Sequence, residues 1–227
     1  MKQMDVQKKL AGEASIDFIK DGMVVGLGSG STVNWMVRKL AERVKEGLDI
    51  KGIPSSKKTE RLALEVGVPL TDFSSVDHID IAIDGADEVD GEFNILKGGG
   101  GSLVREKIVD VNANQLVIIV DESKLVKKLG EFPLPIEVLQ FGWEVTAKKI
   151  AELGGEPVIR VRDGERFISD NGNYILDCQF ERIPKPEELH SNLKQLTGVV
   201  ETGIFTNMAD KVIIARDDKV EIVKVDS

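Results

Sequence analysis

The sequence predicts an α/β fold, in which a mostly parallel sheet has helices on both faces and a smaller α+β insert follows. Short apolar runs alternate with amphipathic segments through the first half of the chain, which is the pattern of strands joined by crossover helices. The alternation stops at a proline-containing segment, 131–135, and apolar runs return at 212–215 and 220–225. At 227 residues, the chain is long enough for one large domain or two small ones.

The first half of the chain is expected to alternate between helices and strands. The opening helix is predicted by apolar side chains that recur at four-residue spacing, namely Val6, Leu10, Ala14 and Phe18. From Val33 to Val44 the apolar residues follow the i, i+3, i+4, i+7 pattern of a core-facing helix. In chain order we expect a helix at 3–20, a strand at 23–27, a helix at 33–44, a strand at 50–53, a helix at 58–66, a strand at 79–83, a helix at 102–112 and a strand at 116–120.

The second half has a different rhythm. Pro133 and Pro135 mark a linker or the first residues of an edge strand. Beyond them we expect helices at 143–153 and after Pro186, strands at 158–162, 174–180 and 199–202, and a turn at 170–173. The last two apolar runs are expected to return to the first sheet. The expected domains are therefore 1–130 together with 206–227, interrupted by an inserted α+β domain at 131–205.

Composition argues against several classes of partner. With 30 basic and 39 acidic residues, the net charge is 30 − 39 = −9, which opposes general nucleic-acid binding through phosphate neutralisation. No apolar run approaches the ~20 residues that span a bilayer, and the start of the chain lacks the apolar segment of a signal peptide. The single cysteine, Cys178, agrees with a reducing compartment and is expected to be buried in a strand. We expect a cytoplasmic protein without nucleic-acid or membrane partners.

A first glycine motif, Gly26 to Thr32, lies between an expected strand and an expected helix. Backbone N–H groups and the positive end of the helix dipole converge there, so the loop favours binding of a phosphate. Ser29, Ser31 and Thr32 add hydroxyl donors. A dinucleotide fingerprint would need glycine at Ser31, and the Gly-Lys-Ser/Thr of a Walker loop is missing. The other interpretation is a tight turn with a helix N-cap.

A second motif follows the expected strand at 79–83. Asp84 and Asp87 are expected at the carboxyl edge of the sheet, where open α/β folds bind ligands. A calcium loop is ruled out, because Ala86 and Glu88 stand where Asp or Asn is required. Magnesium held by these carboxylates stays open. Asp90, which precedes Gly91, is expected to be turn chemistry.

A third motif joins Lys97 to four glycines, 98–101. Consecutive glycines sacrifice backbone entropy, so they indicate a need for close backbone approach. If Ser102 caps the following helix, Glu106 lies about one turn in, near the positive end of the helix dipole. Glu106 then has the setting of a general base, or alternatively pairs with Arg105 or Lys107 in solvent.

These motifs occur in an order that resembles ribose-5-phosphate isomerase of type A. The resemblance rests on 28–32 (Gly-Ser-Gly-Ser-Thr), 84–88 (Asp-Gly-Ala-Asp-Glu), 97–101 (Lys-Gly-Gly-Gly-Gly), 105–107 (Arg-Glu-Lys) and 121–124 (Asp-Glu-Ser-Lys), and it continues through 132–138, 170–173, 198–200 and 203–205. It covers nearly the whole chain. Each motif alone is weak, whereas the ordered set is specific.

The resemblance implies a role for each motif. Glu106 would be the base that moves a proton between C1 and C2 of an open-chain sugar phosphate, Lys97 would face the developing enediolate oxygen, and Asp84 and Asp87 would handle hydroxyl protons and ring opening. The implied substrate-binding residues are Ser29, Gly30, Ser31, Thr32, Asp84, Gly85, Ala86, Asp87, Lys97, Gly98, Gly99, Gly100 and Lys124. Whether Lys57 or Lys58, in the substrate-proximal segment 55–59, touches the ligand is left open.

The resemblance also implies a Rossmann-like catalytic domain with a ferredoxin-like insert, a homodimer or homotetramer, and no cofactor. The chain offers no convincing metal cluster, and His78 and His190 are isolated in the sequence. The expected activity is the interconversion of ribose 5-phosphate and ribulose 5-phosphate. A sugar-phosphate-sensing regulator without turnover is the alternative from another class, and a nucleotide-dependent dehydrogenase is a distant third.

Overall fold

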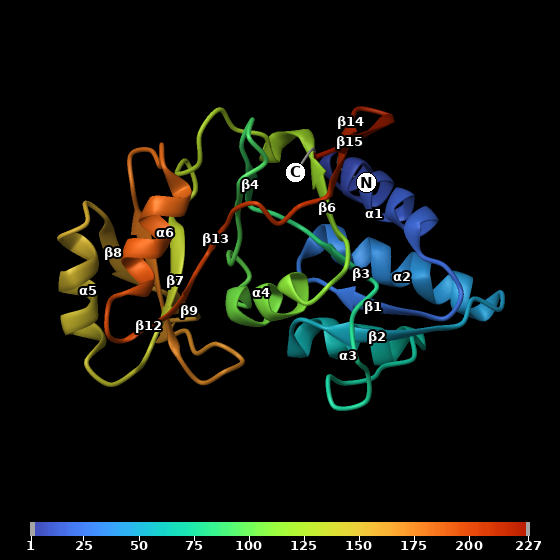
Figure 1. The fold of residues 1–227 in the computed structure, drawn as a ribbon, viewed down its shortest axis with the longest axis horizontal. Helices are drawn as coiled ribbons and strands as arrows, with labels where there is room; N and C mark the ends of the chain where they lie inside the picture. The colour runs from blue at the N-terminus through green and yellow to red at the C-terminus, as the bar shows by residue number, and fades with distance from the viewer. Residues whose placement is uncertain (1–2, 226–227) are drawn as a thin grey trace. The chain divides into compact units, whose positions relative to one another are not determined.

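The structure is a computed structural model that describes residues 3–225 (Figure 1). The chain divides into two compact units. The first comprises the chain up to Ala86, Arg105–Lys124 and the chain from Met208 onward; the second comprises Asp87–Val104 and Leu125–Asn207. The expected domain boundaries differ from this division, because they assign 87–104, 125–130 and 206–207 to the first domain. As a statement about domains, the expected assignment stays a prediction; its residues 1–2 and 226–227 lie outside the described part.

The first unit contains the predicted parallel sheet. Its strand order is β15-β14-β6-β3-β1-β2, and every neighbouring pair is parallel except β14 with β15. The strands are β1 (Met23–Leu27), β2 (Ile50–Pro54), β3 (Ile81–Asp84), β6 (Leu116–Asp121), β14 (Lys211–Arg216) and β15 (Lys219–Lys224). The return of the C-terminal runs to the first sheet is thereby confirmed.

Helices cover both faces of this sheet. Alternate strand residues, such as Val25 and Leu27, share one buried cluster with residues of α1, α2 and α3. On the opposite face a Cβ added at Gly26 would meet Val109 of α4 at 2.6 Å. The helices are α1 (Gln3–Ala14), α2 (Ser31–Lys45), α3 (Lys57–Val66) and α4 (Leu103–Val111), and the 3-10 turns are η1 (Ser15–Phe18) and η2 (Glu122–Lys124). The predicted fold class is confirmed. The single opening helix that was expected at 3–20 is divided into the α-helix α1 and the 3-10 turn η1.

The parallel register decides which loops share an edge. Leu27, Asp84 and Asp121 are the last residues of β1, β3 and β6, which are neighbours in the sheet. Because parallel strands end at the same edge, the loops that follow them lie at the carboxyl edge of the sheet, where open α/β folds bind their ligands. None of the helices within residues 3–225 is long and apolar enough to cross a lipid bilayer.

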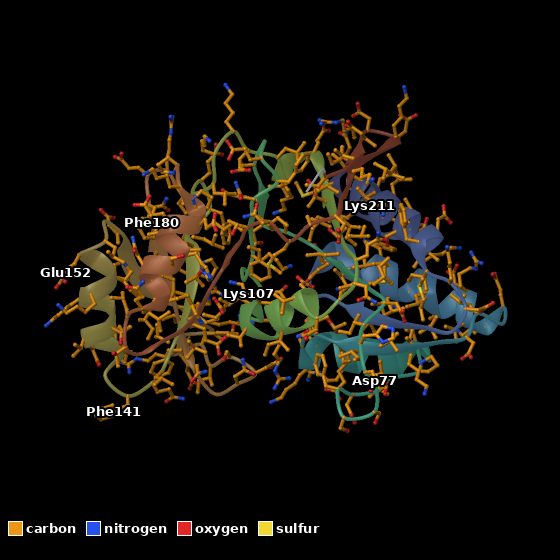
Figure 2. All side chains as sticks on the ribbon, viewed as in Figure 1. Asp77, Lys107, Phe141, Glu152, Phe180 and Lys211 are labelled. Atoms are coloured by element: carbon orange, nitrogen blue, oxygen red, sulfur yellow. The ribbon has the colours of Figure 1, made fainter. Side chains whose placement is uncertain are left out.

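The second unit is an antiparallel sheet with helices. Its four-stranded sheet has the order β12-β7-β11-β8, and the chain order β7-α5-β8-β11-α6-β12 gives the ferredoxin-like topology. The elements are β7 (Leu134–Val138), α5 (Trp143–Ala151), β8 (Glu156–Ile159), β9 (Val161–Arg162), β10 (Glu165–Arg166), β11 (Tyr174–Gln179), α6 (Pro186–Lys194) and β12 (Val199–Thr202). Phe180 belongs to the core of this unit, whereas Phe141 is 97% exposed (Figure 2).

A three-stranded antiparallel sheet was not predicted from the sequence. It consists of β4 (Glu88–Val89), β5 (Ile95–Leu96) and β13 (Ile204–Phe205), in the order β13-β5-β4. Two-residue strands are too short to show a period in the sequence. This sheet connects the acidic motif to the residues just before Lys97.

Pro135 corrects one expectation. It was expected in a linker or at the start of an edge strand, but it lies in β7, which pairs with both β11 and β12. The position accepts a proline because the carbonyl of Gly203, which stands opposite it, receives the N–H of Lys97 at 2.8 Å and needs no donor from β7. Cys178 is buried in β11 as expected, and burial raises the pKa of its thiol. The predicted turn at 170–173 is also confirmed, since the N–H of Gly172 donates to the carbonyl of Ser169 at 2.9 Å.

Candidate active site

The first glycine motif forms the N-terminus of α2. Gly30 is the N-cap residue, with φ 115°, a conformation that favours glycine, and no side chain caps the helix. Ser31 is the first helical residue and is exposed, whereas Thr32 is buried. The first turn of α2 carries no acidic side chain. Its first backbone N–H groups therefore point toward a position where the helix dipole favours an anion.

The loop is fastened to Asp84 at the end of β3. Oδ1 of Asp84 accepts hydrogen bonds from the N–H of Ser29 at 2.9 Å and from the N–H of Gly85 at 2.7 Å. Asp84 is fully buried, and a side chain at Gly28 would overlap its carboxyl group. The carboxylate thus fixes the path of the loop, and only glycine at position 28 permits this approach.

The hydroxyl of Ser29 belongs to a cluster of hydroxyls. It lies 2.9 Å from the hydroxyl of Ser55 and 2.8 Å from that of Ser56, which is the N-cap of α3. Thr59 completes the cluster and donates to the carbonyl of Gly28 at 2.8 Å. The N–H and hydroxyl of Ser29 are both engaged inside the protein, so its expected ligand contact stays a prediction. Lys57 and Lys58 are exposed at the start of α3, and no contact with a ligand is assigned to either.

Asp87 and Gly99 meet in the second unit. The N–H of Gly99 donates to Oδ2 of Asp87 at 2.7 Å, and the N–H of Asp87 donates to the carbonyl of Leu96 at 2.8 Å. A Cβ at Gly99 would lie 2.7 Å from Oδ1 of Asp87, closer than real Cβ contacts. The glycine therefore permits the carboxylate to reach the loop, as the sequence pattern had indicated for close backbone approach.

Lys97 has a hydrogen-bonded backbone N–H and a buried side chain. Its N–H donates to the carbonyl of Gly203 at 2.8 Å, and a side chain at Gly203 would collide with the carbonyl oxygen of Lys97. The Lys97 side chain is buried, with 2% of the residue exposed, and its Nζ lies 5.7 Å from the centre of the Phe205 ring. Burial of a lysine next to an aromatic face gives an ammonium group with a defined position.

Glu106 lies in the first turn of α4, where the helix dipole favours a carboxylate. It is 5% exposed, so the interpretation as a solvated partner of Arg105 or Lys107 is disfavoured. Lys124 lies in η2, directly after β6, and is half-buried. Just before it, Asp121 accepts hydrogen bonds from the N–H and the hydroxyl of Ser123.

The expected site residues divide between the two units. The first unit contains Ser29, Gly30, Ser31, Thr32, Asp84, Gly85, Ala86, Glu106 and Lys124. The second contains Asp87, Lys97, Gly98, Gly99 and Gly100. Hydrogen bonds join Ser29, Asp84 and Gly85 in the first unit and Asp87 and Gly99 in the second.

Two residues near the motifs serve the fold. Asp90 accepts from the backbone N–H groups of Glu92 at 2.9 Å and Asn94 at 3.0 Å, which confirms the prediction of turn chemistry. Glu88, for which the sequence suggested no role, is buried and accepts from the N–H groups of Gly130 and Phe132. Burial raises the pKa of the Glu88 carboxyl, and these two backbone hydrogen bonds act in the opposite direction.

Side chains from the second half of the chain hold the glycine loop, and they were not predicted from the sequence. Arg160 donates to the carbonyl of Gly98 at 2.9 Å, and Asp177 pairs with Arg160. A contact over that separation in sequence leaves no local pattern. Within residues 3–225, no group of three or more His, Cys, Asp or Glu side chains is placed to hold a metal ion.

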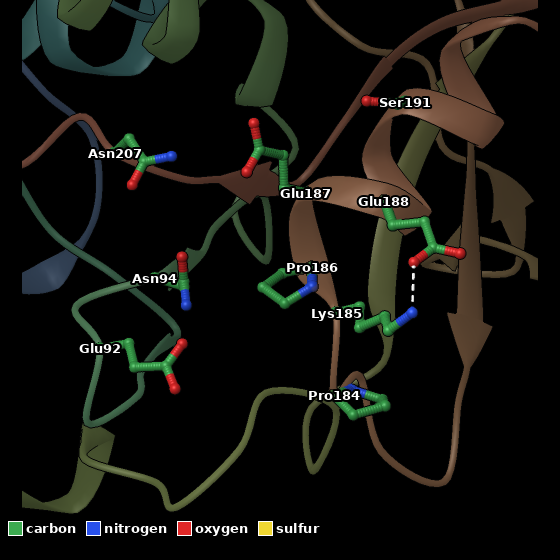
Figure 3. A pocket seen from close by; sticks show the side chains of 9 residues that line it. All are labelled: Glu92, Asn94, Pro184, Lys185, Pro186, Glu187, Glu188, Ser191 and Asn207. Atoms are coloured by element: carbon green, nitrogen blue, oxygen red, sulfur yellow. Dashed lines mark ion pairs between the residues drawn. The ribbon is translucent and has the colours of Figure 1, made fainter.

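A cavity of about 490 Å³ lies at the start of α6 in the second unit (Figure 3). Its lining includes Asn94, Pro186, Glu187 and Asn207. None of the expected site residues lines this cavity. Lys185 there pairs with Glu188 at 2.9 Å, and the pair leaves no unbalanced positive charge for a phosphate.

Fold and motifs together define an α/β enzyme of the Rossmann-like class with a ferredoxin-like second unit. The family of ribose 5-phosphate isomerase A (phosphoriboisomerase A) matches residues 51–219. Ribose-5-phosphate isomerase A 1 of Oceanobacillus iheyensis is 53% identical over 223 residues, which cover 98% of this chain and 100% of that protein. The chain belongs to the ribose 5-phosphate isomerase A family.

Solved structures agree with this assignment. Ribose 5-phosphate isomerase A from Methanocaldococcus jannaschii is 43% identical, with a TM-score of 0.92 over 96% of this chain and 98% of that one. A D-ribose-5-phosphate isomerase in complex with phospho-erythronic acid is 38% identical, with a TM-score of 0.93 over 96% of this chain and 97% of that one.

Proposed function

We propose that this protein interconverts D-ribose 5-phosphate and D-ribulose 5-phosphate through a cis-enediolate. Membership of the family supports the substrate, and so does the relative that was solved with phospho-erythronic acid. One observation carries the mechanism: Glu106 is a buried carboxylate in the first turn of the helix that directly follows the Lys97-Gly98-Gly99-Gly100 loop. A buried acidic side chain in a helix that follows a glycine loop in the sequence is suited to proton transfer rather than to pairing in solvent.

Chemistry explains why a base alone is insufficient. A C–H beside a carbonyl is too weak an acid for a carboxylate to remove unless the charge that develops on oxygen is stabilised. We assign this stabilisation to the ammonium of Lys97 and to the amides of the glycine loop. Glu106 takes the proton from C2 of the open-chain aldose, which leaves an enediolate with its negative charge on O1. The proton of the O2 hydroxyl then passes to O1, so that the charge moves to O2. Glu106 returns its proton to C1, and the electron pair on O2 forms the ketose carbonyl at C2.

Asp84 and Asp87 are proposed to manage the hydroxyl protons and the opening of the sugar ring. Both carboxylates are fixed by backbone N–H donors, at Ser29 and Gly85 for Asp84 and at Gly99 for Asp87. A carboxylate held in this way keeps its orientation without a cost in side-chain entropy during the reaction.

The phosphate is proposed to bind at the start of α2. The uncapped first turn at Gly30, Ser31 and Thr32 supplies backbone donors and the positive end of a helix dipole. Lys124, in η2 at the carboxyl edge of the same sheet, supplies a positive charge. A phosphate group that carries most of the binding energy of a small sugar is a handle for positioning the reacting carbons.

The test is an isomerase assay without added metal ion or cofactor. Purified protein is incubated with ribose 5-phosphate and EDTA, without a nucleotide, and ribulose 5-phosphate is measured. Formation of ribulose 5-phosphate is the expected result, because the proposed mechanism needs neither metal nor redox cofactor. Absence of product contradicts it. Activity restored only by a divalent cation would favour the magnesium interpretation of the acidic motif instead.

We further propose a cytoplasmic homodimer or homotetramer that binds neither nucleic acid nor membrane. The net charge of −9 supports the exclusion of nucleic acid, and the free thiol of Cys178 fits a reducing compartment. Exposed apolar side chains in the second unit, at Leu139, Phe141 and Val145, support self-association. Sedimentation of wild type against Phe141→Glu tests this: a single species that the substitution leaves unchanged contradicts a contact at Phe141.

A further inference from the structure

The glycine loop after Lys97 is held by a guanidinium from a distant part of the chain. Arg160 directly follows β8, and its side chain is 9% exposed. Its Nη1 donates to the carbonyl of Gly98 at 2.9 Å and to the carbonyl of Gly99 at 3.3 Å. One side chain thus fixes the oxygen ends of two consecutive peptides in a loop that has no side chains of its own.

Arg160 is itself fixed on its other side. Its Nε donates to Oδ2 of Asp177 at 2.9 Å, and its Nη2 donates to Oδ1 of the same carboxylate. This bidentate pairing uses the planar fork of the guanidinium and sets its orientation. The Phe167 ring lies 5.8 Å from the guanidinium, and a Cβ at Gly101 would lie 2.5 Å from that ring.

The contact between Arg160 and the carbonyl oxygens also sets the direction of the N–H groups that follow them. In a trans peptide the carbonyl of one residue and the N–H of the next point in opposite directions. Because Arg160 holds the Gly98 carbonyl, the N–H of Gly99 points away from it, and it donates to Oδ2 of Asp87 at 2.7 Å. The Gly98–Gly99 peptide is therefore clamped at both ends.

The next peptide is clamped at one end only. With the Gly99 carbonyl near Arg160, the N–H of Gly100 also points away from the guanidinium. Gly100 is exposed, and within residues 3–225 no protein acceptor receives its N–H. A donor of fixed direction and without a protein acceptor is suited to an oxygen of a ligand.

We propose that Arg160, oriented by Asp177, is a positioning residue for the isomerisation: it fixes the Gly98–Gly99 and Gly99–Gly100 peptides so that their N–H groups face Asp87 and the developing enediolate. This inference rests on the proposed function. Arg160 touches no reacting atom. It acts through the glycine loop, where it adds to the hydrogen bond that the Gly98 carbonyl accepts from the N–H of Gly101 at 2.9 Å and restrains residues that have few conformational restraints of their own. A pre-set donor stabilises the transition state without reorganisation.

The first test compares Arg160→Met with Arg162→Met. Arg162 is a matched control, because it is exposed and its guanidinium also lies on the Phe167 ring, at 4.5 Å, but it contacts no glycine carbonyl. We expect Arg160→Met to lower kcat about tenfold with a change in KM below about threefold, as for the loss of a transition-state donor. Arg162→Met should match wild type. Equal kcat in the two variants, or a change confined to KM, overturns the positioning role.

Chemical rescue separates positioning from folding. Arg160→Ala leaves a space for a free guanidinium ion, and millimolar guanidinium chloride should restore part of the lost kcat while urea at the same concentration should not. Arg160→Lys is the second variant, because it keeps the charge but cannot bind Asp177 and the carbonyls as a planar fork. We expect its kcat to lie between those of wild type and Arg160→Met. No rescue together with a wild-type kcat for Arg160→Lys would overturn the proposal.

Amide exchange tests the clamp without any turnover. Glycine-selective ¹⁵N labelling of the free protein reports the exchange rate of the Gly99 amide, and Arg160→Met should raise that rate while Arg162→Met should not. An unchanged rate overturns the clamp, whether or not the wild type is an isomerase. If the clamp is present but wild type lacks isomerase activity, the proposed function fails and the clamp does not. Faster exchange with unchanged kcat would show that the clamp has no role in catalysis.

Discussion

The backbone N–H of Gly99 donates a hydrogen bond of 2.7 Å to Oδ2 of Asp87. The two residues belong to different motifs of the sequence, and a turn through β4 and β5 separates them. The hydrogen bond fixes a carboxylate that is proposed to act on substrate hydroxyls. It also fixes one peptide of the glycine loop, so the position of each motif depends on the other.

Gly99→Ala should impair catalysis because its new Cβ would lie 2.7 Å from Oδ1 of Asp87. Either the carboxylate or the loop must move, and an ångström of misplacement can lower turnover about 10²-fold. We expect kcat/KM to fall by roughly that factor. Gly91→Ala is the control, since its Cβ meets nothing within 4 Å, and its kcat/KM should equal that of wild type. A Gly99→Ala protein as active as this control would mean that the loop tolerates displacement.

Glu106→Gln should lower kcat by at least ~10²-fold, because an amide cannot take the proton from C2. Substrate binding should be largely preserved, since the substitution keeps the size of the buried side chain. Steady-state kinetics and calorimetric titration with substrate measure the two effects. Glu65→Gln, on the exposed side of α3, serves as the matched control. Near-normal turnover would remove Glu106 from the role of base.

Lys97→Met should depress kcat more than it raises KM. The buried ammonium is proposed to stabilise charge that appears only in the transition state, and its removal should cost about 10²-fold or more in kcat. Methionine keeps the apolar stem against Phe205. Lys148→Met, at an exposed position of α5, controls for the loss of one positive charge. If Lys97→Met changed affinity alone, the proposed oxyanion role would be wrong.

Glu88 predicts a pH dependence of stability with a definite sign. Burial raises its pKa in the folded protein, whereas the unfolded value is about 4.3. Between these two pKa values the folded state binds more protons, so the contribution of Glu88 to the free energy of unfolding falls as pH rises. Glu88→Gln does not titrate, and its single amide oxygen cannot serve the N–H groups of both Gly130 and Phe132. Its stability at low pH should therefore be below that of wild type by about 1–3 kcal/mol.

Urea unfolding of both proteins between pH 4 and 7 checks this. The stability of wild type minus that of Glu88→Gln should decrease as pH rises through the window above 4.3. A difference that stays constant, or that grows with pH, would show that burial does not dominate at Glu88. Glu65→Gln again provides a control, since its carboxylate is exposed.

Sequence periodicity predicted the helices and strands that are long enough to show a hydrophobic repeat. β1 matches its expected range, and α2, α3, β6 and α6 lie close to theirs. The short strands of the β13-β5-β4 sheet escaped prediction because two residues cannot show alternation. Pro135 was misplaced because its tolerance depends on the carbonyl of Gly203, which receives the N–H of Lys97. That information lies in the register of the sheet, which the local sequence does not contain.

In the candidate site, too, local motifs were predictable and contacts between distant residues were not. Asp84, Asp87, Lys97 and Glu106 lie in short motifs whose residue types already suggest proton transfer. The groups that position them come from far along the chain: Arg160 reaches the Gly98 carbonyl, and Gly203 allows the close approach of Lys97. Neither role could be predicted from the local sequence, because the partner of each residue lies far away along the chain.

In the proposed mechanism a proton, and not a hydride, moves between C1 and C2, and exchange of hydrogen with solvent distinguishes the two. Wild-type protein is incubated with ribose 5-phosphate in D₂O until the two sugar phosphates reach equilibrium, and the products are analysed by NMR. Proton transfer through Glu106 predicts deuterium at C1 of ribulose 5-phosphate and at C2 of ribose 5-phosphate, and Glu106→Gln should show neither within the same time. Full conversion with protium retained at both carbons would contradict the enediolate mechanism.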